Sequence, residues 1–297
     1  MELLENFVQK GNAIADAIDD VAIHPVCEAF GRPPDQIRIF MIFLLQYPLG
    51  WFFHYAVHGT FLRHILNIII GIVFQSYLYG FGIMHVVLMA GVAYLIMLLM
   101  PRHKQAPVVM AWVLAYLSYS HLDALLNHFG NYQMDITSYT MLLVCKLSAL
   151  AYCYQDGGTD PEKLNQDQKV RMVVNFPTLL EFSSYVWYSQ ACALGVFFEF
   201  SDYKRWAERS GEYRNVPSPI IPSLKWMLLS ISCLAIYTVA SPYYDCEVCY
   251  KTSFMEFQYW YRIWYYYMAM TIKRLFYYNP FCMTTGAIIA SGLGYNG

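Results

Sequence analysis

The chain has 297 residues, of which 58% are hydrophobic and only 13% are charged, and its formal net charge is −2. An ordinary soluble domain carries about 25% charged residues, so this chain has too few charges to cover a surface in water. The composition excludes a disordered chain, a collagen-like fibre and a soluble nucleic-acid-binding domain, and it leaves an integral membrane protein.

Residues 1–35 form a distinct N-terminal segment. Its apolar side chains recur at helical spacing, at Leu4, Phe7, Ile14, Ile18 and Val21. We therefore expect an amphipathic helix over 3–21, which either lies on the membrane surface or docks on the protein's own spans. Gly31-Arg32-Pro33-Pro34 then ends this helix.

Residues 36–297 form the second part, a multi-span membrane domain. Its eight apolar runs cover about 37–55, 64–80, 82–100, 106–122, 138–154, 179–199, 223–242 and 257–280, and a short run dotted with glycines follows at 281–296. Most of these runs are long enough to cross about 30 Å of hydrocarbon as a helix, and none alternates strictly between polar and apolar residues. The predicted fold class is therefore an all-α, polytopic bundle of transmembrane helices.

The charges in the connections predict how the spans are oriented. Three connections are basic and are expected in the cytoplasm: 101–105, 155–178 and 200–222. Segments 123–136 and 243–256 are poor in Lys and Arg, so we expect them on the opposite side, together with the acidic N-terminus.

The run 179–199 does not fit this pattern, because basic connections flank it on both sides. It also contains polar residues, among them Glu181, Ser184 and Gln190. Non-helical backbone at membrane depth is tolerated only inside protein or against a water-filled cavity. We therefore expect this run to be re-entrant, or to be a broken helix buried among other helices.

Lys146 lies in the middle of an apolar run. A charge in hydrocarbon costs at least about 2.5–3.5 kcal/mol, so this side chain should face a partner or a wet cavity. Carboxylates at the ends of the neighbouring runs are Asp135, Asp156 and Glu181. Two interpretations stay open: Lys146 and these residues line a polar cavity or tunnel, or Lys146 forms a structural ion pair that holds two helices together.

Histidine and cysteine patterns are less specific. His54 and His58 share a helix face, but no third ligand follows at a defined spacing. We therefore predict no metal site and place both, with His64, in a polar cluster beside the lipid headgroups. Cys246 and Cys249 form a Cys-x-x-Cys pattern that is expected to hold a local disulfide or two idle thiols.

Seven aromatic residues crowd into 259–267, where Arg262 also stands. Aromatic surfaces on several faces of a helix suit either helix packing or the lining of an acyl-chain tunnel. For such a lining we take Trp260, Arg262 and Trp264, together with Tyr185, as candidates.

Short matches that follow one another along residues 40–297 resemble a known family. They are Met134-Asp135-Ile136-Thr137, Val144-Cys145-Lys146-Leu147, Asp156-Gly157-Gly158, Phe176-Pro177-Thr178-Leu179-Leu180-Glu181-Phe182-Ser183-Ser184-Tyr185, Pro217-Ser218-Pro219-Ile220-Ile221-Pro222-Ser223-Leu224-Lys225 and Gly292-Leu293-Gly294-Tyr295-Asn296-Gly297. In this order and spacing they resemble the N-terminal half of the membrane-bound O-acyltransferase family. Within it, the chain is similar to the lysophospholipid acyltransferases, and most of all to the type-three lysophosphatidylcholine acyltransferases.

The resemblance implies that a fatty acyl group passes from acyl-coenzyme A to the free hydroxyl of a lysophospholipid, in phospholipid remodelling. It implies no cofactor beyond acyl-coenzyme A as a co-substrate, and a location in the endoplasmic reticulum membrane. The family's catalytic Asn, and its His in a Trp-His-Gly context, match no position here. We expect them beyond Gly297, so the chain alone is expected to be inactive. Where the family has Gly-Pro, this chain has Gly195-Val196, which leaves the substrate preference open.

The polyanionic head of acyl-coenzyme A belongs at the basic connections, where Lys204, Arg205 and Arg209 are candidates to attract it. The expected partners are thus lysophospholipid, acyl-coenzyme A and membrane lipids, and no nucleic acid. Two other classes stay open: a non-catalytic, truncated membrane protein that binds lipid or partner proteins, and, more remotely, a channel or transporter.

Overall fold

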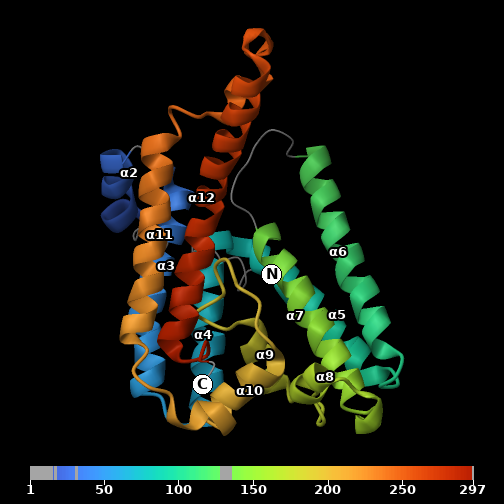
Figure 1. Cartoon of the computed structure of the whole chain (residues 1–297). Coiled ribbons are helices and arrows are strands. Elements are labelled where there is room, and N and C mark those ends of the chain that lie inside the picture. Colours follow the sequence, from blue (N-terminus) through green and yellow to red (C-terminus); the bar gives the residue numbers. More distant parts are fainter. Residues whose placement is uncertain (1–15, 17–18, 31–32, 128–135, 296–297) are drawn as a thin grey trace, which may run out of the picture.

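The computed structural model describes residue 16 and residues 19–30, 33–127 and 136–295 (Figure 1). Every regular element in these ranges is a helix, which confirms the predicted all-α class. Most of the helix expected over 3–21 lies outside the described residues.

Long helices build the body of the described chain. They are α3 (Pro34–Tyr55), α4 (Thr60–Tyr79), α5 (Ile83–Leu99), α6 (Gln105–Asn127), α7 (Thr137–Asp156), α11 (Ile220–Ala240) and α12 (Tyr259–Ser291). Shorter elements connect them: η1 (Asp19–Ile23), α2 (His24–Phe30), η2 (Gly80–Gly82), η3 (Pro161–Lys163), α8 (Gln166–Arg171), α9 (Leu179–Val186), α10 (Phe200–Glu208), η4 (Gly211–Asn215), η5 (Cys246–Tyr250) and η6 (Thr252–Glu256). Each predicted apolar run except 179–199 and 281–296 therefore corresponds to one long helix.

Four stretches of the described chain are long and apolar enough to cross a membrane: α3, the stretch Thr60–Leu99 that holds α4 and α5, α6, and α11. Their apolar surface is largely uncovered, and in the most apolar part of α6 only 11% of the residues are buried. Helices this apolar on their outer faces are stable only against lipid or another protein surface. The chain is therefore an integral membrane protein.

The long helices form two groups that α4 joins (Figure 1). In one group α12 packs along α11 and α3, and in the other α7 packs along α6 and α5. Helix α4 contacts α3 and α5 and also the short helices α9 and α10. The helices α9 and α10 therefore lie against the helix that joins the two groups.

The basic connections around 101–104, 157–178 and 209–219 lie at one end of this bundle, and residues 243–256 lie at the opposite end (Figure 1). This separation agrees with the orientation that the charge pattern predicts. We refer to the end with the three basic connections as the basic end.

Helix α12 corrects one predicted boundary. The runs 257–280 and 281–296 were expected as separate elements, but α12 continues through Pro280 to Ser291. Proline inside a membrane helix removes one backbone hydrogen bond, a loss that packing against neighbouring helices can offset. Here Asn279 and Ser230 of α11 bond to each other beside the proline, with Ser230 Oγ donating to the Asn279 carbonyl at 2.8 Å.

The described part of the N-terminal segment docks on the spans, which was one of its two predicted arrangements. Asp19 is buried and accepts hydrogen bonds from Arg38 of α3, at 3.1 Å from Nε, and from Tyr77 of α4, at 2.7 Å from the hydroxyl. Burial by itself raises the pKa of Asp19, but these hydrogen bonds outweigh it and hold the pKa below its usual range. At neutral pH the carboxylate is therefore ionised and ties η1 to both helices.

Candidate functional site

The predicted break in run 179–199 is present. It begins with the short helix α9, whose N-cap residue Thr178 and Glu181 form a capping box. The helix ends at Val186 with Trp187 as its C-cap, and the residues that follow, 188–193, are buried without being helical. The segment rises from the basic end into the bundle and returns to the same end in α10 (Figure 1). The prediction of a broken helix buried among other helices is therefore confirmed, and the return to the same end is the path that the alternative, a re-entrant segment, would take.

Side chains from three long helices satisfy the backbone of this broken segment. They donate to its carbonyl oxygens: Gln46 of α3 to Ser189 at 3.0 Å, Gln75 of α4 to Cys192 at 3.0 Å, and Thr284 of α12 to Leu194 at 2.6 Å. Asn67 of α4 accepts from the Ser189 hydroxyl at 2.7 Å. Such side-chain partners are what non-helical backbone requires at membrane depth.

Lys146 caps the end of α9. Its ammonium donates to the carbonyl of Tyr185 at 2.5 Å and lies over two aromatic rings, 4.3 Å from the centroid of Tyr185 and 4.6 Å from that of Phe198. Lys146 is 1% exposed, and no ion pair involves it among the described residues. Cations near a helix C-terminus are favoured by its free carbonyls and its dipole, and aromatic faces replace part of the lost hydration.

The carboxylates that were candidates for an ion pair with Lys146 have other partners. Glu181 accepts from Lys204 at 2.8 Å, and Asp156 accepts from Gln168 at 3.1 Å. The predicted ion pair of Lys146 with either carboxylate is therefore wrong, because Lys204 and Gln168 are the partners of these carboxylates. Asp135 lies outside the described residues. Of the predicted cavity residues, the fold brings together Lys146 and Tyr185.

Gly71 of α4 lets this helix contact the broken segment. A Cβ atom built on Gly71 would collide with the carbonyl oxygen of Trp187, a backbone atom that cannot rotate away. Replacing Gly71 with Ala is therefore expected to lower the free energy of unfolding by about 1–3 kcal/mol, as overpacking does elsewhere. The unfolding midpoint in detergent measures this loss.

Gly91 of α5 provides the matched control. A Cβ atom at Gly91 would meet nothing within 4 Å. Alanine there should leave stability unchanged or raise it by about 0.5–1 kcal/mol, since Gly costs that much inside a helix. Equal midpoints for the two Ala variants would contradict the close contact between α4 and the broken segment.

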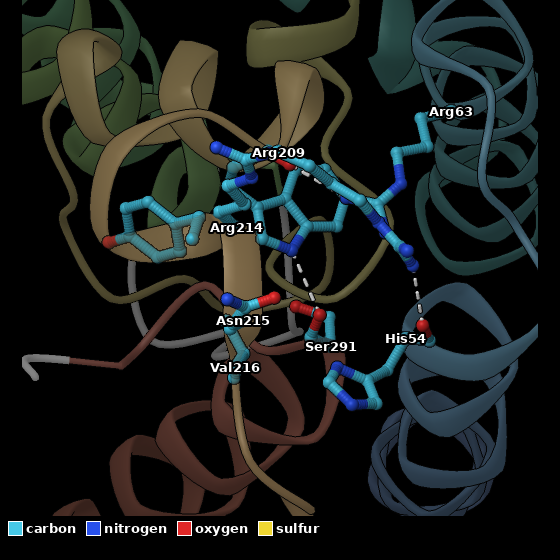
Figure 2. Close-up of a pocket in the computed structure, with 9 residues that line it drawn as sticks. His54, Arg63, Arg209, Arg214, Asn215, Val216 and Ser291 are labelled. Carbon is cyan, nitrogen blue, oxygen red and sulfur yellow. Dashed lines mark hydrogen bonds between the residues drawn. The ribbon is translucent and has the colours of Figure 1, made fainter.

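A cationic pocket of about 200 Å³ opens at the basic end, where α3, α4, α10 and α12 end or begin (Figure 2). We call it the arginine pocket. Its lining consists of His54, Arg63, Trp206, Arg209, Tyr213, Arg214, Asn215, Val216 and Ser291. Ser291 links it to the broken segment, because its hydroxyl bonds to that of Tyr188 at 2.5 Å.

The three arginines of this pocket form no ion pair among the described residues. Arg63 is 2% exposed and donates to backbone carbonyls, including that of Trp206 at 2.7 Å. Arg209 donates to the carbonyl of His54 at 2.7 Å, and its φ of 51° is in the left-handed region that favours glycine. Arg214 is exposed at the mouth of the pocket.

Guanidinium groups without carboxylate partners match the shape and charge of phosphate oxygens. Two neutral side chains of the pocket, Trp206 and Tyr213, bond to the backbone at the end of α12. The Trp206 indole donates to the Ser291 carbonyl at 2.8 Å, and the Tyr213 hydroxyl donates to the Leu293 carbonyl at 2.9 Å. Burial raises the pKa of Tyr213 to about 12, so this hydroxyl stays neutral and adds no negative charge. The pocket is suited to bind an anion such as a phosphate group.

The three residues that the sequence suggested for attracting an anion lie in two different places. Arg209 lines the arginine pocket, whereas Lys204 and Arg205 line a second hollow of about 270 Å³ beside α8. There Lys204 pairs with Glu181 and Glu208, and Arg205 pairs with Asp202. Their charges are largely neutralised, so Arg209 is the stronger candidate of the three.

The aromatic candidates at the start of α12 lie at the other end of the bundle. Trp260 and Trp264 are exposed, and Arg262 contacts Met255 at 3.4 Å. Of the seven aromatic residues at 259–267 only Tyr265 is buried, and the other six stay largely exposed in the described chain even where their rings contact one another. That they line an acyl-chain tunnel stays a prediction.

Sequence reasoning missed two features of this region. Arg63 gave no signal, because a basic residue beside an apolar run has no fixed partner in sequence, and Arg214 was predicted only as one charge of the basic connection 200–222. His64 was expected beside the headgroups but is buried, where its Nδ1 lies 2.6 Å from the Ser184 hydroxyl and 3.1 Å from that of Tyr203. These bonds hold α4, α9 and α10 together.

The fold and the site together define a class: a helical integral membrane protein in which a buried, broken helix adjoins a pocket lined by three arginines. The model of the membrane-bound O-acyltransferase family matches residues 124–296, more than half of the chain. The chain therefore belongs to the membrane-bound O-acyltransferase family.

Several curated relatives are similar over most of the chain. Lysophospholipid acyltransferase 5 of Homo sapiens is 26% identical over 303 residues, which cover 98% of this chain and 60% of that protein. Lysophospholipid acyltransferase 6 of Drosophila melanogaster is 27% identical over 80% of this chain and 35% of its own length. The lysophospholipid acyltransferase of Schizosaccharomyces pombe is 24% identical over 94% of this chain and 56% of its own length. The chain thus spans at most about three-fifths of these relatives.

Proposed function

We propose that this chain is the N-terminal part of a lysophospholipid acyltransferase, which transfers a fatty acyl group from acyl-coenzyme A to the free hydroxyl of a lysophospholipid. The names of the relatives support the acceptor class. The observation that carries the donor is the arginine pocket, with three guanidinium groups free of carboxylates at the basic end. Acyl-coenzyme A has a phosphate-rich head and needs no further cofactor in this reaction.

In this proposal the arginine pocket holds phosphates of the donor. Arg214 lies at the mouth, where it meets the anion first, and Arg209 and Arg63 lie farther in, fixed by carbonyl groups. Fixed donors bind a phosphate without first being ordered, which lowers the cost of binding. The charge also raises the local concentration of a polyanion before contact.

The position of the broken segment inside the bundle supports the same proposal. It contacts α3, α4 and α12 and connects to the pocket through Tyr188 and Ser291. A donor head bound in the pocket would thus place its acyl chain near apolar surfaces inside the bundle, away from water. Excluding water from the thioester favours acyl transfer over hydrolysis.

We further propose that the reacting His and Asn belong to the part of the protein that corresponds to the rest of the relatives' length, with residues 36–297 forming the first part of the membrane domain. The endoplasmic reticulum is the proposed location, since phospholipids are remodelled there. Fractionation of cells with an endoplasmic reticulum marker tests the location.

The function is tested by acyl transfer in membranes that lack such activity. Microsomes that carry the complete protein should convert labelled oleoyl-coenzyme A and a lysophospholipid into phospholipid and coenzyme A. Microsomes that carry residues 1–297 alone should not. Transfer by residues 1–297 at enzyme-like rates would contradict the proposal that the reacting His and Asn lie outside these residues. No transfer by the complete protein would contradict the proposed reaction.

A further inference from the structure

Four amide side chains surround the break after α9. Gln46 comes from α3, Asn67 and Gln75 come from α4, and Gln190 belongs to the broken segment itself. All four are 0% exposed. We refer to them as the amide cluster.

The partners of three amides fix which atom is the oxygen and which the nitrogen. Gln46 and Gln75 face backbone carbonyls, which only accept, so the nitrogen of each amide points there. Asn67 faces the Ser189 N–H at 3.3 Å, so its oxygen points there. Turning any of these amides over would lose the bond it makes.

The other atom of each amide is left without a partner among the described residues. These atoms are Gln46 Oε1, Gln75 Oε1 and Asn67 Nδ2, and Gln190 has neither Oε1 nor Nε2 paired. Gln46 and Asn67 bond to Ser189, Gln75 bonds to Cys192, and Gln190 stands between these two positions in the sequence. The set therefore holds three acceptors and two donor groups around one short stretch of backbone.

Buried polar groups in folded proteins almost always have a partner, because leaving them unpaired forfeits the hydrogen bonds that they make to water when unfolded. A ligand for this set must be small and neutral, and must both donate and accept. Water meets all of these conditions and commonly fills such sites. We propose that ordered water molecules bind at residues 189–192 and bridge the amide cluster inside the bundle, independently of the proposed reaction.

Oxidation by hydroxyl radicals that X-rays generate within microseconds tests this proposal on the complete protein in lipid nanodiscs. Radicals formed from bound water oxidise the side chains beside that water, even where bulk solvent does not reach. Cys192 is the reporter, because it is 0% exposed and lies 3.9 Å from the amide nitrogen of Gln46. Met89 is the control, because it is equally buried but lies in an apolar cluster.

With rates normalised to those of the unfolded protein, Cys192 should be oxidised several-fold faster than Met89. Equal rates would overturn the proposal, and this comparison needs no variant. In Gln190→Leu, which removes both unpaired atoms of that amide at similar volume, the rate at Cys192 should fall toward that at Met89. An unchanged rate at Cys192 in a folded Gln190→Leu protein would also overturn it, since the oxidation would then arise from opening of the segment.

Discussion

Replacing Lys146 with Ala is expected to lower the free energy of unfolding by about 3 kcal/mol, because it removes a buried stem and leaves a buried carbonyl without its donor. Lys146 is 1% exposed, and its ammonium donates to the Tyr185 carbonyl at 2.5 Å between two aromatic rings. Relief from burying a cation offsets part of this loss. The unfolding midpoint of the purified protein in detergent measures the change.

Two variants separate the contributions to that loss. Lys146→Met keeps the volume of the stem and removes only the ammonium, so its destabilisation should be smaller than that of the Ala variant. Lys163→Ala removes an exposed lysine at the basic end and should change stability by less than about 0.5 kcal/mol. A Lys146→Ala protein with wild-type midpoint and activity would show that Lys146 neither caps α9 nor serves the reaction.

Replacing Arg214 with Glu is expected to raise the KM for acyl-coenzyme A about tenfold or more, with little change in kcat. A hydrogen bond to a charged group contributes about 1.5–3 kcal/mol, and 1.4 kcal/mol is about a factor of ten in affinity. The kcat should change little because the proposed contact is to a part of the donor that does not react. Initial rates against donor concentration, in microsomes with the complete protein, measure both constants.

Salt and position provide the controls for this variant. The difference in KM should shrink as ionic strength rises, since Arg214 is exposed and salt screens exposed charges. Lys251→Glu makes the same change of charge on an exposed residue at the opposite end of the bundle and should leave the KM for the donor unchanged. If Arg214→Glu raised the KM for the lysophospholipid alone, the pocket would hold the acceptor's phosphate and not the donor's.

Most of the fold was predictable because helix length and hydropathy are local properties. Each long helix corresponds to an apolar run, and the basic connections marked the end at which 179–199 enters and leaves. The boundary at Pro280 was not predictable, because proline is a helix breaker unless packing outweighs its cost. That packing comes from α11, the preceding long helix, and from α3, which lies far away in sequence.

The site was predictable only in part. Lys146 stood out as a charge in an apolar run, yet its partner was expected to be a carboxylate and is a backbone carbonyl. A helix carbonyl is free to accept such a bond only where the helix ends inside the protein, and no residue type in the sequence marks such a buried end. Lys204 and Arg205 resembled Arg209 in sequence, but acidic neighbours neutralise them and leave Arg209 free of ion pairs among the described residues.

By itself the sequence determined that this protein lies in a membrane, is helical, breaks one of its runs and resembles the acyltransferase family, because composition, hydropathy and the order of short motifs are carried by the chain alone. The tertiary structure decided which polar groups meet. It brought Arg63, Arg209 and Arg214 into one pocket, and it placed Lys146 and the amides of α3 and α4 against the same broken segment. Inside a membrane every polar group needs a partner, and those partners come from helices that are neighbours only after folding.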